Sequence, residues 1–260
     1  MTTRRPKRLY NQLLPWALPA VIIVVWQLLG QYGFISTRIL PTPLSVVRAA
    51  WHLAQKGTLL TYIGISTKRA FIGFAIGGGI GFAIGLVNGL LPIAEKLTDT
   101  SMQMLRNIPH LAMIPLVILW FGIGEEAKLF LVALGVSFPI YLNTFHGIRS
   151  VDPGLVEMGK VYGLRGLRLF WKVILPGALP SILIGVRFAL GIMWITLIVA
   201  ETISADSGIG YMAMNAREFM QMDVVVLGIV IYALLGKLSD YMAKVLERRW
   251  LGWHPNYLNQ

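Results

Sequence analysis

The sequence predicts an all-α membrane protein with six transmembrane helices, and three observations support this fold class. Of the 260 residues, 56% are hydrophobic and only 13% are charged, whereas a soluble domain carries about 25% charged residues. The apolar residues form long runs separated by polar connections, and about 20 apolar residues are needed to cross a membrane as a helix. One soluble core cannot bury this much apolar surface. We therefore treat residues 1–260 as a single transmembrane domain.

The six predicted spans follow the apolar runs in chain order. They are residues 13–29, 71–91, about 101–121, 129–145, 179–200 and 224–235 with some residues beyond. The run Ile108–Phe121 is too short to span alone, so we expect its helix to begin near Ser101. Between the first two spans, Pro41 and Pro43 interrupt regular structure. The residues after them, Leu44–Ala54, are predicted to form an amphipathic helix in the membrane interface.

Glycines recur at every fourth position along the second span: Gly73, Gly77, Gly81, Gly85 and Gly89. Small residues at this spacing let a neighbouring helix approach closely. Because four residues exceed one helical turn, the stripe drifts around the helix and favours a crossing pair of helices. A glycine weakens a helix by about 1 kcal/mol, so tight packing is expected to compensate. A direct role of these glycines in transport is the alternative.

The distribution of Lys and Arg predicts the orientation in the membrane. With six spans, 15 of the 23 basic residues fall on the side that holds both termini and seven on the other side. Because basic loops remain in the cytoplasm, residues 1–12 are predicted to form a basic cytoplasmic N-terminus. Lys68 and Arg69, at the outer start of the second span, are exceptions. The net charge of +11 thus reflects topology, and we expect no nucleic acid partner.

The residue inventory excludes several kinds of chemistry. The chain has no cysteine, which removes disulfides and thiolate metal sites. The four histidines are scattered and lack metal-ligand spacing, so no metal site is predicted. Asp, His and Ser do not cluster as a catalytic site requires. The sequence contains no P-loop, so an ATP-driven machine that used this chain would need its ATPase on another chain.

The stretch from Glu157 to Pro176 is a polar, basic island in the apolar sequence. Before it, Asp152 is suited to cap a helix and Pro153 to occupy its first position. The apolar residues that follow lie at helical spacing, at Leu155, Met158, Val161 and Tyr162. Gly163 is placed where a left-handed residue ends a helix. This pattern predicts a short amphipathic helix whose apolar face is free to enter a groove on a soluble partner.

The island resembles the cytoplasmic coupling loop of bacterial ABC-importer permeases. That motif reads Glu-Ala-Ala, three residues, Gly, nine residues, Ile, one residue, Leu-Pro. The residues in register with it are Glu157, Gly163, Leu175 and Pro176, while Met158, Gly159 and Val173 depart from it. Residues 104–110 and 200–204 extend the resemblance over nearly the whole chain. It points to the nitrate, sulfonate and taurine branch, and within it to the permeases of aliphatic sulfonate importers.

The resemblance implies a type I importer core in the bacterial inner membrane and a subunit that is not itself an enzyme. It implies a homodimer with two ABC ATPase subunits, which bind ATP and Mg, and a periplasmic substrate-binding protein. It assigns ATPase coupling within residues 147–176, to Glu157, Met158, Gly159, Tyr162, Gly163, Leu175 and Pro176. The implied cargo is an aliphatic sulfonate, and taurine, nitrate or another small anion is the alternative.

Three residues are candidates for the translocation pathway: Arg187, Thr196 and Glu201. The sequence places Arg187 inside a span, where a cation must face protein or water. It either attracts an anionic cargo or forms a structural pair with a carbonyl or carboxylate, and we favour the pair. Residues 201–222 are expected to form the periplasmic gate and docking segment. An ion-coupled secondary transporter and a membrane enzyme are the alternatives from other classes.

Overall fold

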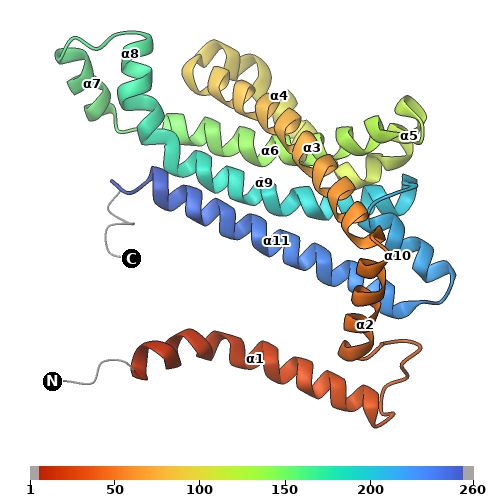
Figure 1. Cartoon of the computed structure of the whole chain (residues 1–260). Helices are drawn as coiled ribbons and strands as arrows, with labels where there is room; N and C mark the ends of the chain where they lie inside the picture. The colour runs from red at the N-terminus through yellow and green to blue at the C-terminus, as the bar shows by residue number, and fades with distance from the viewer. Residues whose placement is uncertain (1–5, 254–260) are drawn as a thin grey trace. The chain divides into compact units, whose positions relative to one another are not determined.

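The computed structural model describes the backbone of residues 6–253 and the side chains of residues 17–253, except those of residues 99, 106, 110, 111 and 204. Arg4, Arg5 and His254 lie outside the described residues. In chain order the α-helices (Figure 1) are α1 Pro6–Gln31, α2 Pro43–Gln55, α3 Thr58–Leu90, α4 Pro92–Asn107, α5 Ile114–Phe121, α6 Glu125–Arg149, α7 Pro153–Val161, α8 Leu167–Leu169, α9 Leu175–Ser204, α10 Ile209–Glu218 and α11 Met222–Trp250.

The prediction of an all-α membrane protein is confirmed. Among the described residues, four helical segments are long and apolar enough to cross a membrane: Thr58–Leu90, Glu125–Arg149, Leu167–Ile203 and Met222–Trp250. Residues Ala17–Gln31 of α1 form a shorter apolar helix. By length and composition the structure therefore supports four of the six predicted spans, and the count of six remains a prediction.

The predicted helix from Ser101 to Phe121 is wrong, because the chain leaves the helical conformation in the middle of it. Helix α4 ends at Asn107, a 3-10 turn follows at His110–Met113, and α5 has only eight residues. Ile108 is extended, with φ −74° and ψ 120°. A proline disfavours the helical conformation of the residue before it, and Pro109 therefore accounts for the break.

The chain divides into two compact units, the first made of residues up to 62 with 212–230 and the second of residues 63–211 with those from 231 onward. In the first unit, α2 confirms the helix predicted at Leu44–Ala54. Thr42 caps this helix by accepting a hydrogen bond from the Ser45 amide at 3.3 Å. The side-chain oxygen of Gln27 on α1 accepts from the Leu44 amide at 3.1 Å.

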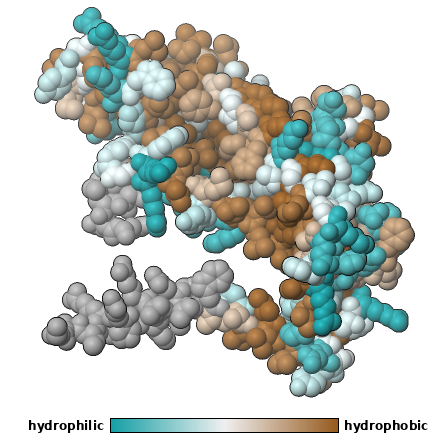
Figure 2. Space-filling model, viewed as in Figure 1, coloured by the Kyte–Doolittle hydropathy of each residue, from teal (hydrophilic) through white to brown (hydrophobic). Residues whose placement is uncertain are grey.

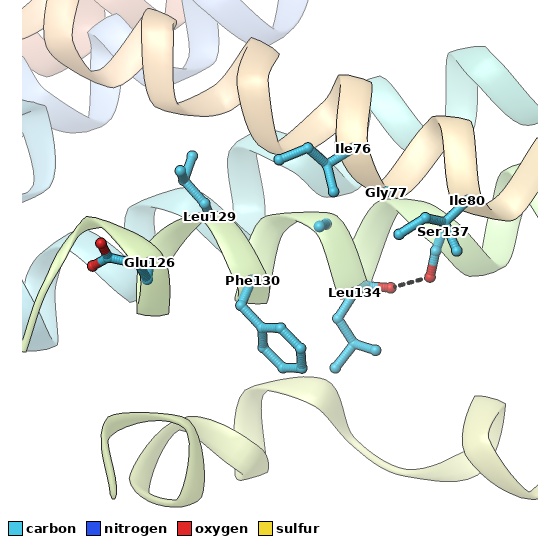
Figure 3. Close-up of a pocket in the computed structure, with 9 residues that line it drawn as sticks. Ile76, Gly77, Ile80, Glu126, Leu129, Phe130, Leu134 and Ser137 are labelled. Carbon is cyan, nitrogen blue, oxygen red and sulfur yellow. Dashed lines mark hydrogen bonds between the residues drawn. The ribbon is translucent and has the colours of Figure 1, made fainter. Parts of the chain in front are cut away.

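In the second unit, α6 packs along α9 and the glycine face of α3 lies against α6. A Cβ added to Gly77 would lie 2.0 Å from the carbonyl oxygen of Ala133, and one added to Gly81 would lie 2.2 Å from that of Ser137. Gly73, Gly85 and Gly89 face the same helix. Figure 3 shows α3 crossing α6 at Gly77. All five glycines of the stripe thus allow a close approach that a side chain would prevent.

The helix that contains α9 begins earlier than the predicted start at residue 179. It begins at Leu167 and passes through a π-helical turn, η2, at Phe170–Ile174. Pro176 has no amide hydrogen to donate within the helix, and a π-helical turn of this kind occurs as a single interruption inside an α-helix. The connection after α6 is therefore residues 150–166. Figure 2 shows polar side chains gathered at α7 and α8 and an apolar surface beyond them.

Candidate coupling and transport sites

Helix α7 is built from the local signals that the sequence carries. The side chain of Asp152 accepts a hydrogen bond from the Gly154 amide at 2.8 Å, which satisfies one of the free donors at the helix start. Pro153 occupies the first turn, where its missing amide hydrogen costs nothing. The start of the predicted helix is thus confirmed at Asp152–Pro153.

The end of α7 is a Schellman motif centred on Gly163. The Gly163 amide donates to the Lys160 carbonyl at 2.9 Å, and the Leu164 amide donates to the Gly159 carbonyl at 3.0 Å. Gly163 has φ +81°, the left-handed conformation that glycine adopts without steric cost. The glycine turn predicted from the sequence is therefore present.

The two faces of α7 have different roles. Gly159 is buried, and a Cβ there would lie 2.8 Å from Cδ1 of Leu169, so this face packs against α8. The other face carries exposed apolar side chains, at Leu155, Met158, Val161 and Tyr162, of which Val161 is 86% exposed. Glu157 is also exposed. Leu175 and Pro176 lie apart from these residues, in the first turn of α9. The second unit thus presents an amphipathic helix whose apolar face it does not bury.

Glu201 was predicted just after the fifth span, at the start of the segment 201–222, but helix α9 continues to Ser204. Glu201 belongs to the last turn of α9 and is 1% exposed. Its carboxylate accepts hydrogen bonds from Ser66 Oγ at 2.8 Å, Arg69 Nη1 at 2.9 Å and the Tyr232 hydroxyl at 2.8 Å. The Gly210 amide also donates to it, at 2.9 Å. Glu201 thus connects α3, α9 and α11 in the second unit.

Arg69, which the sequence placed at the outer start of the second span, is a direct partner of Glu201. Arg69 lies within α3 and is 4% exposed. Its five N–H donors are matched by five hydrogen bonds, to both oxygens of Glu125 on α6, to Glu201, and to the carbonyl and hydroxyl oxygens of Ser207. Lys128, 2% exposed, also donates to Glu125 at 3.2 Å. Two cations and two carboxylates therefore balance in charge.

The turn after α9 folds over Glu201 because it contains two glycines. Gly208 has φ +108°, and a Cβ there would lie 2.5 Å from the Glu201 carboxylate. A Cβ on Gly210 would lie 2.5 Å from Cβ of Glu201. Any side chain at either position would displace the carboxylate. We refer to Ser66, Arg69, Glu125, Glu201, Ser207 and Tyr232 as the Glu201 network. With its donors satisfied, it is suited to fix helices rather than to bind an anion.

Arg187 pairs with a carboxylate, which is the kind of contact that the sequence interpretation favoured. Its Nε donates to Oδ1 of Asp240 on α11 at 2.6 Å, and Lys244 lies 2.9 Å from Oδ2 of the same carboxylate. The Arg187 side chain is 42% exposed. Thr196, the third pathway candidate, is fully buried in α9. The three candidates therefore lie in different environments, and only Arg187 lines a described pocket, between α9 and α11.

A second pocket of about 390 Å³ lies between α3 and α6 (Figure 3). Its lining is apolar apart from Ser137, which donates to the Leu134 carbonyl, and Glu126. The nine described residues that line it include no Lys or Arg. A carboxylate with no cation disfavours a negatively charged ligand, so we assign this pocket no role in anion transport.

The arrangement of these helices is that of an ABC transporter permease. The fold is similar to that in a crystal structure of an amino acid ABC transporter with histidines, with a TM-score of 0.63 and 18% identity over 77% of this chain and 97% of that chain. An inward-facing structure of the MetNI methionine ABC transporter gives a TM-score of 0.53 at 19% identity, over 76% of this chain and 97% of that chain. At these identities the likeness shows the fold alone.

The chain belongs to the family of binding-protein-dependent transport system inner membrane components, which matches residues 75–252. It is 63% identical, over 96% of this chain and 95% of the relative, to a protein of Escherichia coli (strain K12) named as an aliphatic sulfonates transport permease, SsuC. A Bacillus subtilis (strain 168) protein of the same name is 46% identical over 96% of this chain and 91% of its own length. The E. coli (strain K12) taurine transport system permease protein TauC is 32% identical over 95% of this chain and 96% of its own length.

Proposed function

We propose that this chain is the membrane permease subunit of an ATP-driven importer of aliphatic sulfonates. The observation that carries the proposal is the 63% identity over 96% of the chain to a relative named for that cargo. A second relative, at 46% identity, is named for the same cargo. The relative named for taurine is only 32% identical, which favours a sulfonate without an amino group.

In this proposal the chain works as a homodimer with two ATPase subunits, which bind ATP and Mg, and a periplasmic binding protein that selects the cargo. Helix α7 is the part that docks on the ATPase. Its apolar face is exposed, with Val161 at 86% and Tyr162 at 79%, and an amphipathic helix of this kind enters an apolar groove on a partner. Leu175 and Pro176 transmit the movement into α9. Both termini lie in the cytoplasm, and residues 201–222 form the periplasmic segment.

An uptake experiment tests the cargo. The chain is expressed in a strain of Escherichia coli K12 that lacks the 63% identical relative, and membrane insertion is checked by immunoblot. We expect uptake of labelled ethanesulfonate to be restored, and to be lost when cellular ATP is depleted with the proton gradient maintained. Uptake of taurine or nitrate in place of ethanesulfonate would contradict the cargo. Uptake that survives ATP depletion would favour an ion-coupled carrier instead.

A further inference from the structure

The pocket between α9 and α11 combines an open cavity with a cluster of three charged side chains. Its volume is about 460 Å³, and its lining residues are Ile184, Arg187, Phe188, Gly191, Gly236 and Asp240. All of them belong to the second unit. The two helices lie side by side (Figure 1) and are joined by the Arg187–Asp240 pair and by a 2.9 Å hydrogen bond from Trp194 Nε1 to Ser239 Oγ.

The charges beside this pocket do not balance. Asp240 lies between two cations, Arg187 at 2.6 Å and Lys244 at 2.9 Å, so the cluster carries one net positive charge. Asp240 accepts from Nε of Arg187, while the guanidinium has further N–H donors on its terminal nitrogens. The Glu201 network differs, because its two carboxylates, Glu125 and Glu201, are matched by Arg69 and by the neighbouring Lys128.

Arg187 lies deep in one spanning helix, and Asp240 and Lys244 lie toward the C-terminal end of the other. Arg187 is near the middle of the segment Leu167–Ile203, and Asp240 is ten residues before the end of Met222–Trp250. A charged side chain in the middle of a span is costly and is by default a candidate functional residue, and Arg187 is in this position. A negatively charged ligand in the pocket would balance the uncompensated positive charge.

The two glycines of the pocket are not required by helix packing. A Cβ on Gly191 would meet no atom within 4 Å, and one on Gly236 would meet only Cδ1 of Trp194, at 3.9 Å. Neither has a positive φ. The stripe glycines of α3 differ, because a Cβ there would enter α6. Glycine destabilises a helix relative to alanine, and the feature that Gly191 and Gly236 provide in return is the open volume of the pocket.

We propose that this pocket is an anion site of the translocation pathway. The anionic head group of the ligand lies against Arg187, with the positive charge of Lys244 on the far side of Asp240, and its aliphatic chain lies along Ile184, Phe188 and the two glycines. The ligand class is a small organic monoanion with an apolar tail, which an alkanesulfonate matches. The inference rests on the proposed function for its cargo. Asp240 is a positioning residue, which orients Arg187 and weakens the attraction enough for release.

The charge variants Arg187→Gln and Asp240→Asn distinguish an anion site from a structural ion pair. Each removes one partner of the same pair. Arg187→Gln takes the net charge from +1 to 0, and we expect the KM for uptake of ethanesulfonate to rise about tenfold. Asp240→Asn takes the charge to +2, and we expect KM and maximal rate both to fall, because a more tightly held anion leaves more slowly. A structural pair would give similar losses of folded protein and uptake in both variants.

The cavity variant Gly191→Leu tests where the aliphatic chain lies. It fills the pocket from α9, so we expect uptake of octanesulfonate to fall at least about tenfold relative to ethanesulfonate. Gly79→Leu is the matched control, because it adds the same side chain at an open position of α3 and should not change the ratio. An unchanged ratio in Gly191→Leu, or KM shifts of the same sign in both charge variants, would overturn the proposal.

These outcomes are separable from a failure of the proposed function. If the wild-type chain imports a different small anion, the charge variants are measured with that anion, and opposite KM shifts would still support the site. If the wild-type chain imports ethanesulfonate and Arg187→Gln leaves KM unchanged, the proposed function stands and the anion site is wrong.

Discussion

Arg69 and Glu201 form the most buried ion pair among the described residues of the second unit, with side chains 4% and 0% exposed. A buried pair adds little net stability compared with apolar residues, but removal of one partner leaves a buried charge without compensation. The Glu201 network therefore acts mainly by fixing one arrangement of α3, α6, α9 and α11. Any movement of these helices must keep its hydrogen bonds or break several of them together.

The substitution Glu201→Gln tests this role. The amide keeps the shape of the side chain but loses the charge that pairs with Arg69. Because Glu125 remains as a partner of Arg69, we expect the free energy of unfolding to fall by about 3 kcal/mol, the lower end of the range for a broken buried pair. The thermal midpoint in detergent should fall with it. Glu126→Gln, at an exposed position on α6, is the control. Equal midpoints for the two variants would show that the network does not contribute to stability.

The sequence did not reveal this network, because its members lie far apart along the chain. Arg69 lies 56 residues from Glu125 and 132 from Glu201, and no local pattern reports such pairings. Arg69 was taken for an exception to the positive-inside rule, and that exception was the available signal. The glycine pair at Gly208 and Gly210 was a second signal, because a turn of this kind allows the backbone to approach a neighbouring group closely.

At the scale of the helices, the glycines of α3 differ according to the surface that they face. Gly77 contacts the backbone of α6, whereas nothing lies within 4 Å of a Cβ on Gly79. Gly77→Ala forces α3 and α6 apart and should lower the thermal midpoint. Gly79→Ala should leave it unchanged or raise it, since alanine favours a helix by about 1 kcal/mol. Thermal unfolding of both variants checks this. A lower midpoint only in Gly79→Ala would contradict the assignment of Gly77 to the face of α3 that packs on α6.

Local signals predicted some helices well and others poorly. Helix α7 was predicted because its cap, its first proline and its final glycine are all within eleven residues of one another. The helix that contains α9 was given a late start, because Arg168, Lys172 and Pro176 are typical of a loop. The continuous helix predicted from Ser101 to Phe121 was wrong because its bounds were set by hydropathy, which does not take account of the helix break at Pro109. Polar or proline-containing helical turns depend on tertiary packing, which periodicity does not report.

At the scale of the whole molecule, the two main sites lie at opposite ends of one helix. Leu175 begins α9 beside the α7 and α8 segments, and Glu201 lies near its end. Glu201 is 26 positions after Leu175, which corresponds to about 39 Å at the rise of an α-helix and is more than the hydrocarbon thickness. A movement applied at α7 therefore has a continuous helix along which to reach the Glu201 network, and it passes Arg187 on the way.

The measurement that tests the central claim most directly is copurification of the ATPase. The chain is tagged, extracted gently from its membrane and examined for bound proteins. We predict a stoichiometric ATPase with the wild-type chain and with Gly163→Asn, because asparagine tolerates a left-handed backbone. We predict its loss in Gly163→Val, since a β-branched residue at φ +81° is strained and misdirects α7. An intact chain without ATPase, or full ATPase binding and uptake in Gly163→Val, would contradict the assignment of α7 as the coupling helix.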